Sequence, residues 1–426
     1  MPTKQPNVIQ VRIWDKLVGA VAPDHRAGLY AFQYAPAWIK RKIELSPLQM
    51  PLSKHPYSFP NIARITYKGL PGLLADCLPD DFGNALIDAW MARRGMDKDS
   101  ITSLDRLAYM GKRGMGALEF RPSTGSHRES QAALKMAELV RVARDVVHGN
   151  IGDEYAAETA LTNIIRVGTS AGGARPKAVV AWNRATNELR SGQFDCPAPF
   201  EHWLIKFDGI GAGAELGASS ADGRIEYAYY KMATAAGIEM SECRLLHENG
   251  RHHFMTKRFD RDNNDKHHIQ SLCGLNHLDY KQRQTNAYEQ LFSAIERLQL
   301  NAKDKEQAFR RMVFNCASKN CDDHAKNHGF RLRMGASWEL APAYDITYAY
   351  APNNPWTHQH LMSVNGKFKD ITRSDLLTVA QTYNIPGATQ VINDVNNAID
   401  AWGGYAKDAG VPQENITLIG IHHVKL

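Results

Sequence analysis

The hydrophobic residues near the start of the chain alternate with polar ones at a period of two. Residues 7–20 carry this alternation and then turn, which predicts a β-hairpin that opens a small N-terminal domain. Tyr30, Phe32, Tyr34 and Trp38 continue an alternation of the same kind, which predicts a further extended segment. The first part of the chain is therefore expected to begin as β structure.

Farther along, apolar residues recur every three or four positions, as on one face of a helix. This spacing predicts helices over residues 80–95 and 102–110, followed by a short strand over 117–120. The segment 121–130 is polar and rich in Pro, Gly and Ser, so it predicts a domain boundary. An amphipathic helix over 131–150 is predicted directly after it.

Beyond this boundary, short apolar runs between loops give way to mostly helical patterns. Strands are predicted at 178–183, 202–208 and 252–259, with a helix over 224–237 that ends at Gly237. The later helices are predicted over 286–299, 304–318 and 374–383. The order of elements is therefore α+β first, then a mixed β-rich region, then an α-rich region.

The composition places the chain among ordinary globular proteins. It has 426 residues, 43% hydrophobic and 23% charged, which is enough for two or three domains. It shows no apolar run of the about 20 residues that a membrane span needs and no secretory signal pattern. The six cysteines form no C-x-x-C pair, so we expect reduced thiols in a cytoplasmic protein that does not contact membranes.

The net charge is mildly basic. Lys and Arg number 51 against 45 Asp and Glu, for a net charge of +6. This excess is compatible with contact to phosphate, nucleic acid or acidic proteins and identifies none of them.

A glycine-rich loop occupies residues 168–177. Its small residues would let backbone N–H groups approach an anion, and Arg175 and Lys177 add positive charge. It is not a Walker A motif, because it lacks the closing Lys-Ser/Thr and leads into a strand. A glycine loop between two strands is also how protein kinases cover nucleotide phosphates. An ordinary glycine turn is the alternative.

Lys206 lies inside the apolar strand that is predicted over 202–208. Burial of a lysine is costly unless the charge is paired. In kinases a strand lysine contacts the nucleotide phosphates and pairs with a helix glutamate, and Glu226 near the start of the next predicted helix is a possible partner. The alternative is an edge-strand lysine that points to water.

The segment 320–329, NCDDHAKNHG, carries the most informative chemistry. Asp322 precedes Asn327 by five positions, the D-x-x-x-x-N spacing of a kinase catalytic loop, and Asp345 follows later in LAPAYDIT. One carboxylate can accept a hydroxyl proton, while an amide oxygen and a second carboxylate can hold Mg²⁺. His324 and Lys326 add donors for phosphate oxygens. A turn or helix cap explains any single aspartate, but not this ordered set together with the glycine loop and the strand lysine.

At these residues the chain resembles the HipA family of serine/threonine kinases, the toxins of type II toxin–antitoxin pairs. SAGGARPK, WLIKF, EYAYYKMATAAGI, KRFDR, DDHAKN and LAPAYDI occur in the order of the family's kinase domain. The hairpin near residues 8–20 and GLLADCLPDDFGNALI resemble its small N-terminal domain. The resemblance implies an α+β, bilobal, protein-kinase-like (HipA-like) fold. Its parts would be an N-terminal domain over 1–125, a kinase N-lobe over 126–260 and an α-rich C-lobe over 261–426.

The resemblance also implies roles for individual residues. Asp322 would be the catalytic base, and Asn327 and Asp345 would bind Mg²⁺. The expected ATP contacts are Gly172, Gly173, Ala174, Arg175, Pro176 and Lys177 of the phosphate loop, Lys206, the hinge residues Lys257, Arg258 and Phe259, and His324, Lys326, Asn327 and Tyr344. Asp323 places a second acid where other members can have glycine, and the five-residue spacing to Asn327 selects Asp322 as the base.

Ser170 falls where the family carries a regulatory autophosphorylated serine. A phosphate there would add about two negative charges, so we expect it to expel the loop and switch the kinase off. The hinge often carries Glu where this chain has Lys257, so adenine recognition is expected to use backbone groups. The implied partners are a HipB-like helix-turn-helix antitoxin, a protein substrate of unknown identity, and operator DNA only within the antitoxin complex.

Two other functions fit a kinase-like chain. One is a pseudoenzyme that serves as a binding module or co-repressor, although every expected catalytic residue type is present. The other is a small-molecule phosphotransferase, since lipid and sugar kinases share the lobe layout. A zinc site built from Cys316, Cys321, His324 and His328 lacks the usual finger spacing. The histidine pairs at 252–253, 267–268 and 422–423 are expected to face solvent.

Overall fold

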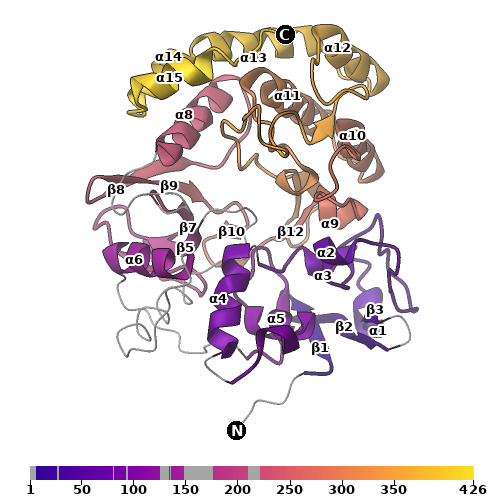
Figure 1. Cartoon of the computed structure of the whole chain (residues 1–426). Coiled ribbons are helices and arrows are strands. Elements are labelled where there is room, and N and C mark those ends of the chain that lie inside the picture. Colours follow the sequence, from indigo (N-terminus) through magenta and orange to yellow (C-terminus); the bar gives the residue numbers. More distant parts are fainter. Residues whose placement is uncertain are drawn as a thin grey trace. The chain divides into compact units, whose positions relative to one another are not determined.

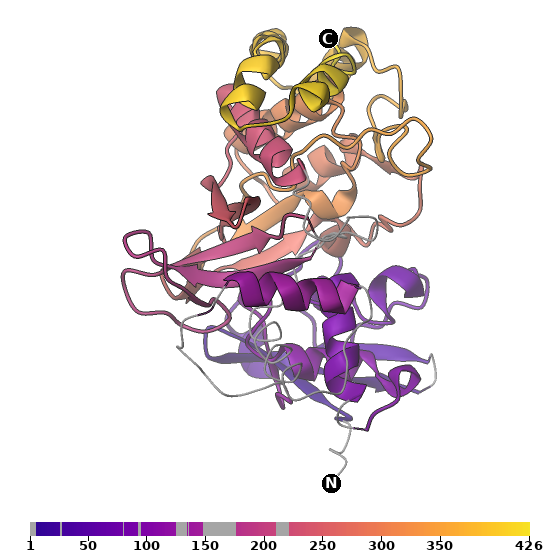
Figure 2. The ribbon, with the colours of Figure 1, turned by 60° about the vertical axis from the view of Figure 1, so that its left-hand side comes forward.

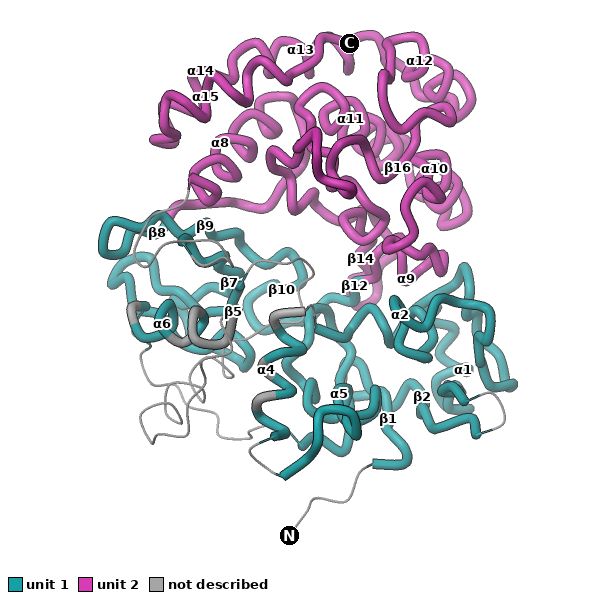
Figure 3. The backbone as a smooth tube through the Cα atoms, viewed as in Figure 1, with its two compact units in different colours: residues 1–220, 246–269 teal, residues 221–245, 270–426 magenta. Residues whose placement is uncertain are grey.

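The computed structural model describes most of the chain. The described residues are 6–25, 28–79, 81–92, 95–124, 134, 136–147, 176–209 and 221–426. The chain divides into two compact units, one of residues 1–220 and 246–269 and the other of residues 221–245 and 270–426 (Figure 3). The boundaries that the sequence places near residues 125 and 260 stay a prediction.

A four-stranded sheet opens the first unit. Its strands are β1 (Ile9–Ile13), β2 (Lys16–Asp24), β3 (Leu29–Tyr34) and β4 (Glu119–Arg121), in the order β3-β2-β1-β4. Trp14 and Asp15 join β1 to β2 with φ of 47° and 59°, the positive values of a tight hairpin turn that matches strand twist. Ile9, Val11 and Ile13 are fully buried on one face of β1. The predicted hairpin and the strand through Tyr34 are confirmed.

The predicted extended segment does not reach Trp38. Trp38 lies in a short helix, α1 (Pro36–Ile39), whose first residue is Pro36. Proline has a fixed φ that suits this position and lacks the N–H that the position leaves unbonded. Trp38 lies four residues after Tyr34, and both side chains are buried. A spacing of four residues fits one face of a helix as well as one face of a strand.

Helices follow the strand β3 along the chain, both before and after β4. They are α2 (Arg64–Tyr67), α3 (Gly72–Ala75), α4 (Asp81–Ala92), η1 (Lys98–Ser100), α5 (Ser103–Met110) and α6 (Met136–Val147). The helices predicted over 80–95, 102–110 and 131–150 are confirmed as α4, α5 and α6. Thr102 and Asp105 begin α5 with a capping box, in which each side chain accepts a hydrogen bond from the other residue's backbone N–H.

A second sheet lies mostly in the first unit, in the order β6-β5-β7-β9-β8, and its edge strand β8 begins in the second unit. Its strands are β5 (Lys177–Trp182), β6 (Leu189–Ser191), β7 (Glu201–Lys206), β8 (Cys243–Glu248) and β9 (Arg251–Lys257), and a two-stranded ribbon follows, β10 (Arg261–Asp262) with β11 (Asp265–Lys266). Every residue of β5 is buried. The register of β5 on β7 places Lys177 directly opposite Lys206.

The second unit is rich in helices. Its helices are α8 (Asp222–Ala235), α9 (Leu272–Asn276), α10 (Tyr288–Arg297), α11 (Ala302–Ser318), η2 (Ala325–Asn327), α12 (Arg373–Thr382), α13 (Ala388–Asp400), α14 (Trp402–Asp408) and α15 (Gln413–Gly420). Its short strands are β13 (Asn286–Ala287), β14 (Gly329–Leu332), β15 (Trp338–Leu340) and β16 (Met362–Ser363), and β12 (His268–Ser271) begins in the first unit and ends in the second. Figures 1 and 2 show the yellow C-terminal helices lying along α8 and α11.

Helix α11 forms the centre of this unit. Phe309, Met312, Val313 and Phe314 are all fully buried on it. It ends at Lys319 in the left-handed conformation, with φ of 57°. The chain therefore turns sharply and enters the segment 320–327 from a rigid, buried support.

The sequence analysis expects the histidine pairs to face solvent, but the structure does not expose them. His253 is fully buried, and its Nδ1 accepts the backbone N–H of Asp208 at 2.9 Å. His268 is also buried, and its Nε2 lies 2.9 Å from the carbonyl oxygen of Leu45. A neutral imidazole can be buried when a ring nitrogen finds a backbone partner, and burial accordingly lowers the pKa of His268 to about 4.

Two remaining expectations concern the environment of the protein. All six cysteines are buried free thiols. Among the described residues, no helix combines the length and the apolar character that a membrane span requires.

Candidate active site

The segment after α11 is anchored at both of its ends. Asn320 Nδ2 donates to Asn315 Oδ1 on α11 at 2.9 Å. The backbone N–H of Cys321 donates to the carbonyl of Ala349 at 3.2 Å. At the far end, Asn327 Nδ2 donates back to the carbonyl oxygen of Asp322 at 2.8 Å. These bonds close 320–327 into a fixed loop, which we call the catalytic loop.

The two adjacent acids of this loop have opposite environments. Asp323 has no exposed side-chain surface and accepts three hydrogen bonds, from Tyr288 Oη at 2.9 Å, His360 Nδ1 at 3.0 Å and the Leu361 N–H at 2.8 Å. The side chain of Asp322 is 50% exposed. Only Asp322 is therefore open to an incoming hydroxyl group, as the five-residue spacing predicts.

Asp323 and His360 form a buried ion pair. Burial opposes the charged form of each, but the His360 charge and the hydrogen bonds to Asp323 lower the pKa of this carboxyl. Burial likewise opposes the imidazolium, but Asp323 raises the pKa of His360 well above its usual value. Asp323 thus binds the loop to a segment that lies 37 residues farther along the chain.

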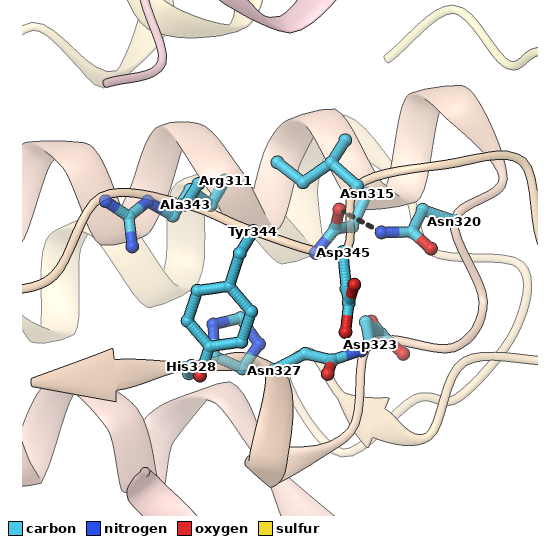
Figure 4. Close-up of a pocket in the computed structure, with 10 residues that line it drawn as sticks. Arg311, Asn315, Asn320, Asp323, Asn327, His328, Ala343, Tyr344 and Asp345 are labelled. Atoms are coloured by element: carbon cyan, nitrogen blue, oxygen red, sulfur yellow. Dashed lines mark hydrogen bonds between the residues drawn. The ribbon is translucent and has the colours of Figure 1, made fainter. Parts of the chain in front are cut away.

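A small pocket lies beside this loop (Figure 4). It is lined by Arg311, Asn315, Asn320, Asp323, Asn327, His328, Ala343, Tyr344, Asp345 and Ile346. The Asp345 carboxylate points toward the wall that Asn327 and Asp323 form (Figure 4). Asp345 has a φ of 53°, a value that costs energy for a residue with a side chain and often occurs at functional sites.

Asn327 and Asp345 fit the hard oxygen ligands that Mg²⁺ prefers. The amide nitrogen of Asn327 is bonded to Asp322, so its oxygen is the atom that remains for a cation. No group of three or more His, Cys, Asp or Glu residues suited to a metal is found among the described residues. A magnesium ion here would therefore take its other ligands from phosphate and water, as this ion usually does.

His324, Lys326 and Tyr344 lie around the same loop. His324 Nε2 is 3.7 Å from Asp322 Oδ1. The Tyr344 hydroxyl donates to the carbonyl oxygen of Lys326 at 2.9 Å, so this side chain supports the loop backbone. A Cβ atom at Gly329 would come within 3.0 Å of this hydroxyl. The structure thus brings together the six predicted residues of the second unit, from Asp322 to Asp345.

The predicted phosphate-binding residues of the first unit are only partly described. Ser170, Gly172, Gly173, Ala174 and Arg175 lie outside the described residues. Pro176 precedes β5, and its carbonyl accepts the Phe207 N–H at 3.1 Å.

Two lysines share the end of the β5–β7 pair. Lys177 is only 2% exposed, and Lys206 Nζ lies 5.6 Å from the centre of the Phe254 ring. Two cations directly opposite each other destabilise a strand pair unless negative charge compensates them.

The predicted hinge has a defined side-chain arrangement. Lys257 Nζ forms an ion pair with Glu201 Oε1 at 2.6 Å. The buried Arg258 guanidinium donates twice to Asp260, at 2.9 and 2.7 Å. Phe259 lies between these two residues in the chain. An adenine contact at Arg258 would therefore use the backbone, as the sequence analysis expects for this segment.

Several residues of these networks were missed by sequence reasoning. Asp260 accepts bonds from Arg258, Arg261 and the Gly116 N–H, and although burial opposes its charge, the two arginines hold its pKa far below the usual range. Asp260 stands between arginines in KRFDR, a charge pattern that could have indicated it. Tyr288 and His360 carry no such signal, because they lie 35 and 37 residues from Asp323.

Glu226 lies in α8 and is 2% exposed. It belongs to the second unit, whereas Lys206 belongs to the first. Pairing of these two side chains stays a prediction.

Comparison with known protein families decides the relationship of the chain. Residues 9–121 match the HipA N-terminal domain, and residues 169–402, more than half of the chain, match the HipA-like C-terminal domain. The chain belongs to the HipA family. No curated protein matches it significantly.

One solved structure of the HipA family agrees on the fold. A chain of the Shewanella oneidensis MR-1 toxin–antitoxin complex of HipA, HipB and operator DNA matches with a TM-score of 0.66 at 18% identity, over 97% of this chain and 94% of that one. The Helicobacter pylori proinflammatory kinase CtkA matches with a TM-score of 0.32 at 14% identity, over 52% of this chain and 90% of that one. The predicted α+β, HipA-like fold class is confirmed.

Proposed function

We propose that this HipA-family protein is an ATP-dependent serine/threonine protein kinase. The observation that carries the proposal is the contrast within the catalytic loop. Asp322 presents an accessible carboxylate beside Asn327, while the carboxylate of the neighbouring Asp323 is buried and paired with His360. A kinase needs one open carboxylate at this position of the D-x-x-x-x-N motif.

The proposed reaction is in-line transfer of the ATP γ-phosphoryl group. Asp322 accepts the proton of the attacking serine or threonine hydroxyl, whose oxygen forms the new bond to phosphorus as the bond to ADP breaks. Asn327 and Asp345 would hold Mg²⁺, which would neutralise phosphate charge. Lys177 and Lys206 bind phosphate oxygens, and His324, Lys326, Tyr344, Pro176 and the hinge residues position the nucleotide. Positioning and charge neutralisation supply most of the rate.

The remaining parts of the proposal concern regulation and partners. Ser170 and the loop of Gly172 to Arg175 are proposed as the autophosphorylation site and the phosphate loop. A helix-turn-helix antitoxin like HipB is proposed as the neutralising partner in the cytoplasm, and the similar Shewanella structure, a complex of HipA with HipB and operator DNA, supports this choice. Operator DNA would be bound within such a complex.

The test is phosphate transfer from labelled ATP and Mg²⁺ by the full chain. We expect the wild type to label itself and a mixed protein acceptor, and not a panel of sugars and lipids. Lys206→Met should lower transfer about a hundredfold, because it removes a charged donor to the phosphates. Lys98→Met is the matched control, since Lys98 is 77% exposed. Labelling of a sugar or lipid alone would indicate a small-molecule phosphotransferase, and no ATP use would indicate a pseudoenzyme.

A second expectation arises from Gly329 and Tyr344. In Gly329→Ala the new methyl group would meet the Tyr344 ring and hydroxyl at 3.0–3.5 Å. It would therefore displace the Tyr344 hydroxyl, which donates to the Lys326 carbonyl oxygen. We expect phosphate transfer to fall about tenfold, since small displacements at a reacting site cost rate. The double variant Gly329→Ala/Tyr344→Leu relieves the contact but lacks the hydroxyl. If transfer by Gly329→Ala equals that of the wild type, Tyr344 does not position the loop.

A further inference from the structure

Contacts between basic side chains and aromatic rings gather at one place in the second unit. Its described part includes the following contacts, measured from the cationic atom to the ring centre. They are Lys281 to Tyr280 at 5.9 Å, Lys326 to Tyr280 at 5.6 Å, Arg283 to Trp356 at 5.5 Å and Lys319 to Tyr350 at 5.5 Å. We call Tyr280, Lys281, Arg283, Lys319, Tyr350 and Trp356 the cationic rim.

One side of the rim is tied to the proposed base. The Tyr280 ring lies 5.0 Å from the ring of His324, and His324 Nε2 lies 3.7 Å from Asp322 Oδ1. Lys281 follows Tyr280 directly in the chain. Its ammonium nitrogen lies 5.9 Å from the centre of the Tyr280 ring, so Lys281 is linked to the proposed base through Tyr280 and His324.

The other side is tied to the start of the catalytic loop. The Cys321 N–H donates to the carbonyl of Ala349 at 3.2 Å, and the Ala349 N–H donates to the carbonyl of Lys319 at 3.2 Å. These two bonds hold Tyr350 and Lys319 beside the residue that precedes Asp322. Lys319 and its ring partner Tyr350 are therefore held at the start of the catalytic loop.

The loop that carries Trp356 begins and ends at the site. It leaves the pocket after Ile346 and returns at His360, which is bonded to the catalytic loop. Arg283 donates to the carbonyl of Pro355 at 2.6 Å, which joins the two rim segments. Trp356 is nevertheless 42% exposed, so a large ring and a guanidinium are presented together to solvent.

The rim cations also differ from other basic residues of the unit in their partners. In the described part of the unit, Lys281, Arg283 and Lys319 contact rings and have no carboxylate within ion-pair distance. The basic residues that do have such a carboxylate include Lys231, Lys303, Lys305, Arg310, Lys367 and Lys425. The charge of the rim is therefore available to a partner.

We propose that the rim binds acidic residues that flank the phosphorylated serine or threonine of a protein substrate. This inference rests on the proposed kinase function and names its substrate class. Carboxylates complement the three cations, and charge complementarity of this kind selects partners. Single-stranded nucleic acid also binds basic and aromatic surfaces by stacking bases on open ring faces, but each rim ring has a cation over one of its faces, which leaves less ring surface for bases.

The test uses two peptides that each contain one serine and differ only in their flanks, four glutamates or four lysines. Phosphate incorporation from labelled ATP gives kcat/KM for each peptide, divided by the peptide-free rate of ADP formation of the same variant. We expect the wild type to prefer the glutamate peptide about tenfold, and Lys281→Glu/Arg283→Glu to lose this preference. The matched control is Lys369→Glu/Lys407→Glu, which changes the net charge equally at two exposed lysines and should keep it.

The possible failures are distinguishable. If the wild type forms no ADP and labels nothing, the kinase proposal is overturned. If it forms ADP but uses both peptides alike, uses neither, or prefers the lysine peptide, the rim proposal alone is overturned, as it is if the rim variant keeps the preference. Equal use of the peptides, together with oligouridylate binding that the rim variant loses, would assign the surface to single-stranded RNA.

Discussion

Asp322→Asn should lower phosphate transfer by about a thousandfold while the protein stays folded. General-base catalysis by a positioned carboxylate contributes about 10²–10⁴-fold, and asparagine keeps the shape of the side chain but cannot accept the proton. The measurement is phosphate incorporation from labelled ATP, into the chain itself and into a protein acceptor, under single-turnover conditions.

Nucleotide binding and folding serve as the controls for this variant. The Asp322 side chain is half exposed and lies 3.7 Å from His324 Nε2, and substitution of such a surface side chain should change the free energy of unfolding by less than about 0.5 kcal/mol. ATP affinity should also remain, because the base does not hold the phosphates. Transfer at the wild-type rate would exclude Asp322 as the base and with it the proposed mechanism.

Asp323→Ala, one residue farther along, should instead lower the free energy of unfolding of the protein. It leaves the His360 imidazolium buried without its partner and removes the acceptor of the Tyr288 and Leu361 bonds. Breaking a buried ion pair by removing one partner costs about 3–5 kcal/mol. Urea unfolding followed by tryptophan fluorescence and circular dichroism should show this loss. Asp322→Asn is the matched control, and similar stability of the two variants would contradict the structural role of Asp323.

The same pair predicts a dependence of stability on pH. The folded-state pKa of His360 is raised, so its contribution is full below its unfolded pKa of about 6.5 and is lost as the pH rises through the folded value. The folded-state pKa of Asp323 is lowered, so its contribution is present above about pH 4 and is lost as the pH falls through the folded value.

His360→Gln should therefore cost the most stability between about pH 4 and 6.5, and the difference from the wild type should shrink as the pH rises further. Unfolding free energies measured across this range test the sign. A difference that grows with rising pH would show that His360 is neutral in the folded protein.

Local patterns in the sequence were sufficient for the elements and for the order of the site residues. The hairpin at Trp14 and Asp15 follows from alternation interrupted by a two-residue turn, and the helices from their period of three to four. The pattern was insufficient at Trp38, where Pro36, two residues earlier, begins a helix instead of continuing the strand. It was also insufficient at His253 and His268, because partners distant in sequence decide whether a histidine can be buried.

The sequence by itself determined the HipA-like fold class and the spacing of Asp322, Asn327 and Asp345 along the chain, because these depend on residues close together in sequence. Only the tertiary structure decided which of the two adjacent acids is accessible. That choice depends on bonds from Tyr288 and His360, and on the open position of Asp322 beside them. Hydrogen bonds between residues more than 30 positions apart leave no periodic trace in a single chain, so their chemistry is visible only once the chain is folded.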